Sequence, residues 1–491
     1  MQRVSRFRRI RLGAALFCVL VLAAACGTRE SDQAIRADNV SGITKLISQR
    51  ESIASGPASN GATSSGSSTT VPGSGAVAGG SGGSSGSAGS SGAKSSTSAT
   101  STGGATANSN AVSSAPHAAS GSVVNVGVLG TFSGAVGAYI DAITQGIQVW
   151  AKYTNANGGL NGHPVNVIVA DDGGSPATYN SLAEQLVTQD HVIAMIFTTL
   201  GFAPDGNNSY FDSQHILTFA TEGGLNNSYS DPWIPTSEAT GTAYAEAMMF
   251  GYAEGMIPQN LTKIAVVTCT DFSLCSNDFS TTWNSSAMQT ASGLQVVYSA
   301  QASLTTPDFT NICIGAKNAG AQGILLGMDT ASIERMSADC AQQGYHPIMG
   351  VADLLAEPSL AQDPNDQGAI VATKTVPWIT NVPGTQTLDK AFAEFDPSAT
   401  VDGTYANGWE AGEFFGAAAA DLPANPTPQD VLNGLNSLKG TDLGGLTYPL
   451  YFTAGQPSPE KVCFGTAVVK NSAFAPGPGQ PFSCHAFVPV S

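Results

Sequence analysis

The sequence is poor in charge and has no apolar run long enough to cross a membrane. Only 11% of its 491 residues are charged. The apolar run at 12–25 has 14 residues, fewer than the roughly 20 that a spanning helix needs. From Val123 onward, nine Lys and Arg residues stand against 32 Asp and Glu residues. Because nucleic-acid binding depends on basic side chains that neutralise phosphates, this balance excludes a nucleic-acid-binding protein.

Motifs for metal binding and catalysis are also missing. The six histidines are scattered without H-E-x-x-H spacing, and no cysteine pair has C-x-x-C spacing. The string at 82–86 matches G-x-S-x-G, but it lies in a Gly/Ser tract without the strand and helix that a nucleophile elbow needs. We therefore expect no cofactor, no metal ion and no catalytic residue, and we do not expect an enzyme.

The N-terminus has the features of an export signal. Five arginines precede the apolar run, which ends in small residues before Cys26. The string at 22–27, LAAACG, resembles a bacterial lipobox, which implies a signal peptide over 1–26 and lipidation of Cys26. The alternative is an ordinary secretory signal with a chance cysteine. In both cases we expect the mature chain outside the cytoplasm, and with lipidation it is anchored to the outer face of the cell membrane.

Residues 27–122 form a predicted tether rich in Gly, Ser, Ala and Thr. Between 52 and 122 the only charged residue is Lys94, and large apolar side chains are almost absent. Such a segment cannot bury enough apolar surface to offset the entropy of ordering, so we expect disorder. A flexible coil of this length spans about 45 Å on average.

From Val123 onward, short β-branched runs alternate with stretches of helical period. One helix places Ile140, Ile143, Ile147 and Trp150 on a single face. This alternation predicts an α/β fold with parallel sheets. The predicted strands are 123–129, 165–170, 192–198, 216–220, 264–268, 294–299, 323–327 and 347–350. Helices near 387–396, 404–420 and 427–438 follow, with strand-like pieces near 446–452, 462–469 and 482–488.

Six cysteines remain in this region, and they fit an oxidising compartment. Six cysteines allow fifteen pairings, between which the sequence cannot choose. We favour pairing of nearest neighbours, because each pair then encloses one local unit of structure. The predicted disulfides are Cys269 with Cys275, Cys313 with Cys340, and Cys463 with Cys484.

Two strings carry a family resemblance. The first is VGVLGTFSG at 126–134, and the second is NANGGLNG at 155–162, followed by a strand and Asp171-Asp172. In this order they resemble type I periplasmic binding proteins, most closely the leucine/isoleucine/valine-binding proteins of ABC importers, over about 123–455. The resemblance implies two Rossmann-like lobes joined by a three-segment hinge, with a ligand cleft between them. The lobes would comprise 123–236 with 374–443, and 237–373 with 444–491.

The resemblance also implies ligand-binding positions at the carboxyl ends of strands. In this scheme the acid that pairs with a ligand ammonium follows Met349-Gly350, where Asp353 lies near although Ala352 aligns more simply. Backbone N–H groups of the 131–134 loop meet a ligand carboxylate. Asp353 and Glu222 also fit solvated loop acids, Trp409 also fits a core residue, and the two threonines also fit plain strand ends. The predicted ligand-binding residues are Tyr139, Thr198, Thr199, Ala220, Thr221, Glu222, Phe272, Asp353 and Trp409.

The implied function is that of an extracytoplasmic solute-binding lipoprotein of an ABC importer. We expect it to capture a small polar ligand by hinge closure: a branched-chain or other amino acid, an amide or a small carboxylate. The expected partners are the ligand and the membrane permease subunits, and we expect a monomer. The alternative is a ligand-sensing receptor on the same fold, which a neighbouring histidine kinase gene would favour over a neighbouring permease gene. A surface hydrolase is a third option, which recovery of unchanged ligand would oppose.

Overall fold

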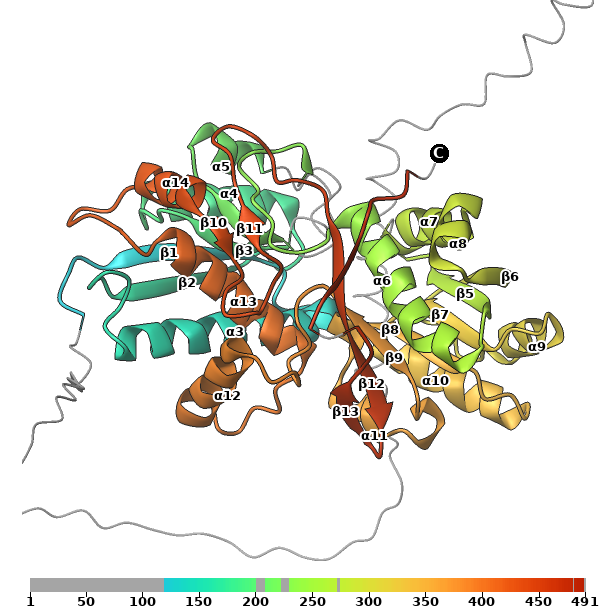
Figure 1. Cartoon of the computed structure of the whole chain (residues 1–491). Coiled ribbons are helices and arrows are strands. Elements are labelled where there is room, and N and C mark those ends of the chain that lie inside the picture. Colours follow the sequence, from blue (N-terminus) through green and yellow to red (C-terminus); the bar gives the residue numbers. More distant parts are fainter. Residues whose placement is uncertain (1–118, 200–207, 222–228, 272–273, 480, 490–491) are drawn as a thin grey trace, which may run out of the picture. The chain divides into compact units, whose positions relative to one another are not determined.

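The computed structural model describes residues 119–199, 208–221, 229–271, 274–479 and 481–489. These residues form two main β-sheets with helices on both faces (Figure 1). Within the described ranges, no helix is both long and apolar enough to span a membrane. The leader, Cys26 and the tether to residue 118 lie outside the described residues.

The first sheet is parallel and has the strand order β2-β1-β3-β4. Alternate residues of β1 face opposite sides: Val126 and Val128 contact the core beneath helices α3 and α13, whereas Leu129 packs toward α4. This alternation explains why both faces of the sheet carry helices. The elements are β1 (Val124–Gly130), α3 (Gly134–Ala156), β2 (Val165–Asp171), α4 (Pro176–Thr188), β3 (Met195–Thr198), α5 (Ser209–Ser213) and β4 (Thr218–Thr221).

The second sheet has the order β13-β12-β9-β8-β7-β5-β6, with β14 paired to β12. Strands β5 to β9 are parallel, and β12 joins β9 in the antiparallel direction. Helix α6 (Gly241–Met256) lies along one face of this sheet and is almost wholly buried (Figure 1). The strands are β5 (Lys263–Cys269), β6 (Gln295–Ala302), β7 (Gly323–Gly327), β8 (Ile348–Ala352), β9 (Ile370–Thr373), β12 (Val462–Lys470), β13 (Ala473–Pro476) and β14 (Ser483–His485).

Shorter elements complete the second part and connect it to the first. Helices α9 and α10 cover the face opposite α6 and α7, and α12 to α14 return to the first sheet. The helices are η2 (Ile257–Gln259), η3 (Leu274–Phe279), α7 (Ser280–Asn284), α8 (Ser286–Ser292), α9 (Thr310–Asn318), α10 (Thr330–Gln342), η4 (Asp353–Leu355), α11 (Pro358–Gln362), η5 (Pro364–Asp366), α12 (Pro383–Phe395), α13 (Gly403–Ala418) and α14 (Pro428–Ser437). A small sheet pairs β10 (Lys439–Thr441) with β11 (Leu450–Tyr451).

Helices α3 and α13 meet at backbone distance. A Cβ on Gly408 would lie 2.0 Å from the Ile143 carbonyl oxygen, and one on Gly146 would lie 2.3 Å from the Tyr405 carbonyl oxygen. Only glycine allows this approach. Helix α13 is therefore fixed to the first sheet although it follows strands β5 to β9 of the second sheet in the chain.

The predicted fold class is confirmed: the chain forms two α/β lobes with parallel strands. The chain passes between the two sheets three times, through segments that include 229–240, 374–382 and 442–461. Strand β9 was not predicted, and β3 and β4 begin later than predicted. The residue boundaries of the lobes stay a prediction. The positive φ values of Gly158 (105°) and Gly159 (73°) give the tight helix exit that the NANGGLNG string indicates.

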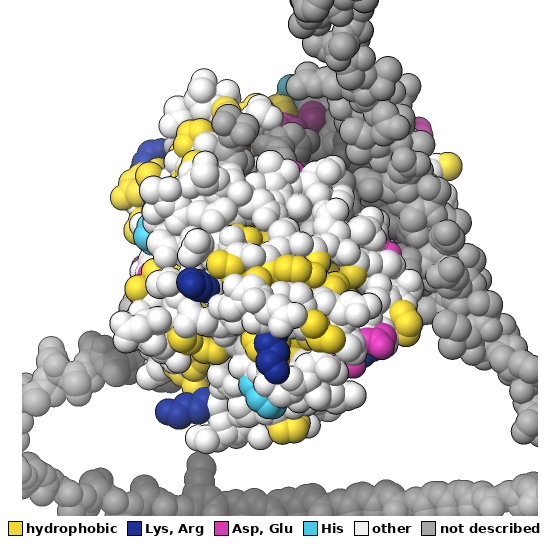
Figure 2. Space-filling model, turned by 90° about the vertical axis from the view of Figure 1, so that its right-hand side faces the viewer, with side chains coloured by type: hydrophobic (Ala, Val, Ile, Leu, Met, Phe, Trp, Pro, Cys, Tyr) yellow, Lys and Arg dark blue, Asp and Glu magenta, His cyan; other side chains and the backbone are white. Residues whose placement is uncertain are grey.

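The three predicted disulfides are confirmed. Cys269–Cys275 joins the end of β5 to η3, Cys313–Cys340 joins α9 to α10, and Cys463–Cys484 joins β12 to β14. All three lie in the part built on the second sheet. On the face drawn in Figure 2, charged side chains are few and separated, as the low charge content of the sequence predicts.

Candidate ligand site and the junction between the sheets

The carboxyl edge of the first sheet carries two adjacent acids, Asp171 and Asp172, which hold the loop after β1. Asp172 is buried and accepts hydrogen bonds from the Thr131 hydroxyl and the Gly174 N–H, both at 2.7 Å. Asp171 accepts from the Phe132 N–H at 3.0 Å. We name this group, Thr131, Phe132, Asp171 and Asp172, the edge cluster. It fixes the backbone that enters α3.

The two acids of the edge cluster respond differently to their surroundings. Burial would raise the pKa of Asp171, but the N–H donors of Gly173 and Phe132 outweigh burial and hold its pKa below the usual value. Burial raises the pKa of Asp172, although the Thr131 hydroxyl and the Gly174 N–H oppose this shift. Neutral hydrogen-bond donors, rather than a basic side chain, therefore stabilise both carboxylates.

The predicted use of free N–H groups in the 131–134 loop is wrong for two of them. The Thr131 N–H donates to the Thr199 hydroxyl oxygen at 3.1 Å, and the Phe132 N–H donates to Asp171. The protein itself satisfies these donors, because the paired aspartates and Thr199 lie directly beside the loop.

Thr198 and Thr199 end β3 and are both fully buried. Thr199 anchors the loop after β1 through the Thr131 N–H. Thr198 lies beside the Tyr179 hydroxyl of α4, where burial raises the pKa of Tyr179. The Thr198 hydroxyl opposes this rise in the pKa of Tyr179. The contact of Thr198 and Thr199 with a ligand stays a prediction.

Five of the predicted ligand positions are placed by their backbone alone or lie outside the described residues. Glu222 and Phe272 lie outside the described residues, as does the predicted lipidation site Cys26. Tyr139 lies in α3, and Ala220 and Thr221 end β4, where Thr221 pairs in register with Thr198. The backbones of β3 and β4 thus bring the predicted positions 198, 220 and 221 to one edge.

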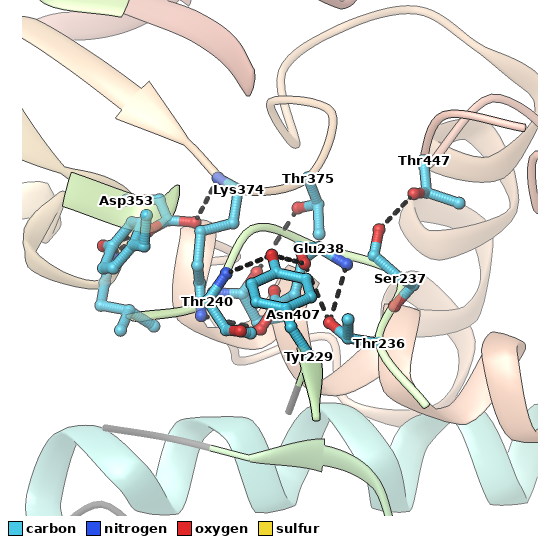
Figure 3. Close-up of polar contacts among 12 residues, drawn as sticks. Tyr229, Thr236, Ser237, Glu238, Thr240, Asp353, Lys374, Thr375, Asn407 and Thr447 are labelled. Atoms are coloured by element: carbon cyan, nitrogen blue, oxygen red, sulfur yellow. Dashed lines mark hydrogen bonds and ion pairs between the residues drawn. The ribbon is translucent and has the colours of Figure 1, made fainter. Parts of the chain in front are cut away.

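Asp353 follows β8 and is 1% exposed. Its Oδ1 accepts from the Tyr244 hydroxyl at 3.1 Å and from the Leu354 N–H at 3.0 Å, and its Oδ2 accepts from the Lys374 N–H at 3.1 Å. Groups of the protein therefore surround both carboxylate oxygens. Figure 3 shows Asp353 beside the backbone of Lys374.

Trp409 is also fully buried, in the α3–α13 contact. Its ring meets Tyr153 edge to face, with 5.7 Å between centroids. The indole N–H has no hydrogen-bond partner in the described part of the chain. This position gives Trp409 a packing role between α3 and α13.

A buried ion pair lies where the three crossing segments meet. Lys374 Nζ and Glu238 Oε1 are 3.0 Å apart, with side chains 6% and 10% exposed. Lys374 also lies over the Tyr244 ring, 5.3 Å from its centroid. Glu410 of α13 adds another buried carboxylate, whose Oε1 has no hydrogen-bond partner among the described residues. We call this region the junction: Ser237, Glu238, Asp353, Lys374, Glu410 and the residues bonded to them.

Hydrogen bonds join all three crossing segments at the junction (Figure 3). The Thr447 hydroxyl donates to the Ser237 carbonyl at 2.6 Å, which joins the third segment to the first. The Thr236 N–H donates to Ser458 Oγ at 2.9 Å, which repeats that connection. The second segment joins the first through Lys374 and Glu238.

The sequence analysis did not identify Glu238, Lys374 or Glu410. Burial raises the pKa of Glu238, although Lys374 opposes the shift. Burial, and after it the charge of Glu238, raises the pKa of Glu410 to about 8. The available signal was Lys374, one of only nine basic residues after Val123, which directly follows the apolar strand β9. Among the described residues, no three His, Cys, Asp or Glu side chains are grouped to hold a metal ion.

Comparison with known proteins identifies the fold. A family model described as periplasmic binding protein matches residues 123–461. No curated protein matches the chain. A fatty acid ABC transporter substrate-binding protein from Thermomonospora curvata is 16% identical, with 75% of this chain and 93% of that chain covered and a TM-score of 0.57.

Two further solved structures are similar. A leucine-binding protein from Thermotoga maritima is 14% identical, with 72% of this chain and 98% of that chain covered and a TM-score of 0.57. A solute-binding protein of an ABC transporter from R. palustris, in complex with benzoate, is 16% identical, with 72% and 95% covered and a TM-score of 0.55. At these identities the likeness establishes the fold.

Proposed function

The chain belongs to the periplasmic binding protein family, and from this premise we propose that it captures a small organic solute and delivers it to an ABC permease. The solute binds between the two lobes, at the carboxyl ends of their parallel strands. Closure about the crossing segments then brings both lobes onto it, and the closed state gains contacts that the open state lacks. The protein binds its solute without turning it over.

The junction is the observation that carries this proposal. Three crossing segments are joined to one another by buried hydrogen bonds and one ion pair, while one face of each sheet packs in a core cluster of its own. A connection of this kind gives two rigid bodies a short common axis. It supports a hinge rather than a fixed interface, because few chain segments cross.

The proposed ligand is a small carboxylate or amide without an α-ammonium group. The named neighbours are described with a fatty acid, with leucine and with benzoate, each of which joins a carboxylate to an apolar body. In this chain Asp353, the expected partner of an ammonium, already accepts three hydrogen bonds from protein groups. We propose that Asp353 belongs to the hinge and that Thr198, Thr199 and Thr221 mark the ligand edge.

Neutral groups would bind the ligand carboxylate. Lys374 is the basic side chain at the junction, and it is buried against Glu238. Hydroxyl and backbone N–H donors therefore have to supply the hydrogen bonds, as they do for Asp171 and Asp172 within the protein. Tyr139 and Phe272 remain proposed contacts around the apolar body of the ligand, and Glu222 remains a proposed polar contact. Trp409, by contrast, is buried between α3 and α13.

A thermal-shift screen tests the ligand class. At 100 times its Kd, a true ligand stabilises the protein by about 2.7 kcal/mol. We expect monocarboxylates and amides to raise the melting temperature, and the matching α-amino acids to raise it less. A larger shift with the amino acid of each pair would contradict the proposed class.

Substitution at the proposed edge tests the site. Thr221→Ala should abolish the ligand-dependent shift, because it removes a hydroxyl at the carboxyl end of β4. Thr262→Ala is the matched control, since Thr262 is exposed and directly precedes the opposite end of β5. Equal shifts in both variants would remove Thr221 from the site.

We also propose that the chain acts outside the cytoplasm, held by a lipid on Cys26. The lipobox-like string and the long Gly/Ser tether support this arrangement. Globomycin treatment should leave an unprocessed, larger precursor. Unchanged processing in its presence would contradict lipidation and leave ordinary secretion.

A further inference from the structure

The junction has more buried acids than bases. Glu238, Asp353 and Glu410 are 7%, 1% and 2% exposed, and Lys374 is the basic residue among them. The charge of a buried acid needs a cation or a full set of hydrogen-bond donors. An acid that has neither a cation nor a full set of donors carries an uncompensated charge.

Two of the three acids have an ion-pair partner or hydrogen-bond donors. Glu238 forms the ion pair with Lys374 at 3.0 Å. Asp353 accepts from the Tyr244 hydroxyl and from two backbone N–H groups. Glu410 is different, because its Oε1 is buried and has no hydrogen-bond partner among the described residues. By elimination, Glu410 carries the unbalanced charge.

The groups that face Glu410 come from each crossing segment. Ser237 and Glu238 lie on the first, Lys374 on the second and Tyr448 on the third, while Glu413 lies one turn further along α13. Burial, followed by repulsion from Glu238, raises the pKa of Glu410 to about 8, and Ser237 and Lys374 oppose this rise. The direction agrees with the unpartnered oxygen.

We propose that the junction holds one exchangeable proton on Glu410, and that loss of this proton loosens the contact between the crossing segments and α13. With the proton bound, Glu410 is neutral beside the Lys374–Glu238 pair. Without it, two carboxylates on different parts of the hinge repel each other across Lys374. Because α13 is fixed to the first sheet by its glycine contacts with α3, this repulsion acts between the lobes.

The proposal rests on the proposed function only in that the lobes move about the crossing segments. Its test uses no ligand, so its failure would leave the capture of a solute untouched. A failed ligand screen would likewise leave the proton unaffected.

Amide hydrogen exchange of the full chain tests the proposal. For peptides covering 229–240 and 374–382, the exchange rates of wild type and Glu410→Gln are compared at the same pH, which cancels the intrinsic pH dependence of exchange. We expect a ratio near one at about pH 4.5, because in the loosened state Glu410 has the ordinary pKa of a glutamate. At about pH 9 the wild type should exchange about tenfold faster or more, because one pKa unit corresponds to a factor of ten.

Glu413→Gln is the matched control. Glu413 lies on the same helix and burial raises its pKa to about 7, but it faces Trp150 rather than Lys374. Because the charge of Glu413 is the weakest cause of the raised pKa of Glu410, its removal should change the exchange of both peptides much less than Glu410→Gln does. A ratio that stays at one through pH 9, or an equal effect of Glu413→Gln, would overturn the proposal.

If Glu410→Gln fails to fold, the wild-type protein alone tests the proposal. Exchange of the two junction peptides, relative to an α9 peptide of the same molecule, should rise between about pH 4.5 and pH 8 and level off above pH 8. A constant relative rate would overturn the proposal.

Discussion

The edge cluster and the junction solve the same problem, buried carboxylates, in different ways. At the edge, Asp172 relies on a hydroxyl and a backbone N–H at 2.7 Å. At the junction, Glu238 relies on Lys374, and Glu410 shares that single cation. Neutral donors fix a local loop and leave the neighbouring acid ionised. A shared cation couples distant segments, and burial raises the pKa of both carboxyls beside it, Glu238 and Glu410.

Removal of Lys374 should have the largest effect. Lys374→Met leaves Glu238 buried without a counter-charge, which costs about 3–5 kcal/mol of unfolding free energy. Urea unfolding at neutral pH measures this loss. Lys390→Met on α12, where the side chain is exposed, should change stability by less than about 0.5 kcal/mol.

The double variant Lys374→Met with Glu238→Leu sharpens the result. Replacement of both charges by apolar groups should recover most of the loss, since the buried charge is then gone. If Lys374→Met alone costs less than about 1 kcal/mol, the junction does not depend on its ion pair.

Removal of a neutral donor at the edge should cost less. Thr131→Val takes the hydroxyl away from buried Asp172, and we expect a loss of about 1–3 kcal/mol by urea unfolding. Thr178→Val, exposed on α4, is the control. A Thr131→Val loss as large as that of Lys374→Met would remove the difference between the clusters.

Asp171 and Glu410 should contribute to the pH dependence of stability with opposite signs. The pKa of Asp171 is lowered in the folded state, so its contribution is present above its unfolded value of about 3.8 and is lost as pH falls through the folded value. The pKa of Glu410 is raised to about 8, so its contribution is present below about 4.5 and is lost as pH rises toward 8.

Asp171→Asn tests the acid side of this contrast. Since Asp171 is exposed, the loss at neutral pH should be no more than about 0.5 kcal/mol. The slope of stability against pH below about pH 4 should become shallower. An Asp171→Asn profile that changes only above neutral pH would reverse the assigned sign.

A higher salt concentration should have the smallest effect on stability. It should weaken the contribution of exposed Asp171 more than that of the buried Lys374–Glu238 pair. An increase from 0.1 M to 1 M shortens the Debye length from roughly 10 Å to 3 Å. The Asp171→Asn difference should then fall below about 0.2 kcal/mol, while the Lys374→Met difference should persist because that pair is buried. Loss of the Lys374→Met difference in salt would show an accessible pair.

The strands and the disulfides were readable from sequence because their signals are local. The run at 323–327 became β7 without change, and each cysteine paired with its nearest neighbour. Strand β9 was missed because four residues, IVAT, are too short for a periodic signal. It is held by its neighbours β8 and β12, which lie elsewhere in the chain.

The site was predicted less well because its contacts are long-range. Glu238 and Lys374 are 136 residues apart, and no motif connects them. The resemblance pointed to Asp353 as a ligand contact, but its surroundings depend on Tyr244, 109 residues earlier. The edge cluster was partly visible, since paired aspartates after a strand marked the right loop. Which N–H groups of the loop donate to the two aspartates depends on the backbone geometry, which the sequence does not show.

The three disulfides have a practical consequence. They use all six cysteines beyond the tether, so the folded part keeps no reactive thiol of its own. A cysteine placed at exposed position Lys390 would therefore take up a fluorescent dye at one defined point of that part. With Cys26 replaced, such a conjugate would be an optical sensor whose emission reports solute capture without any separation step.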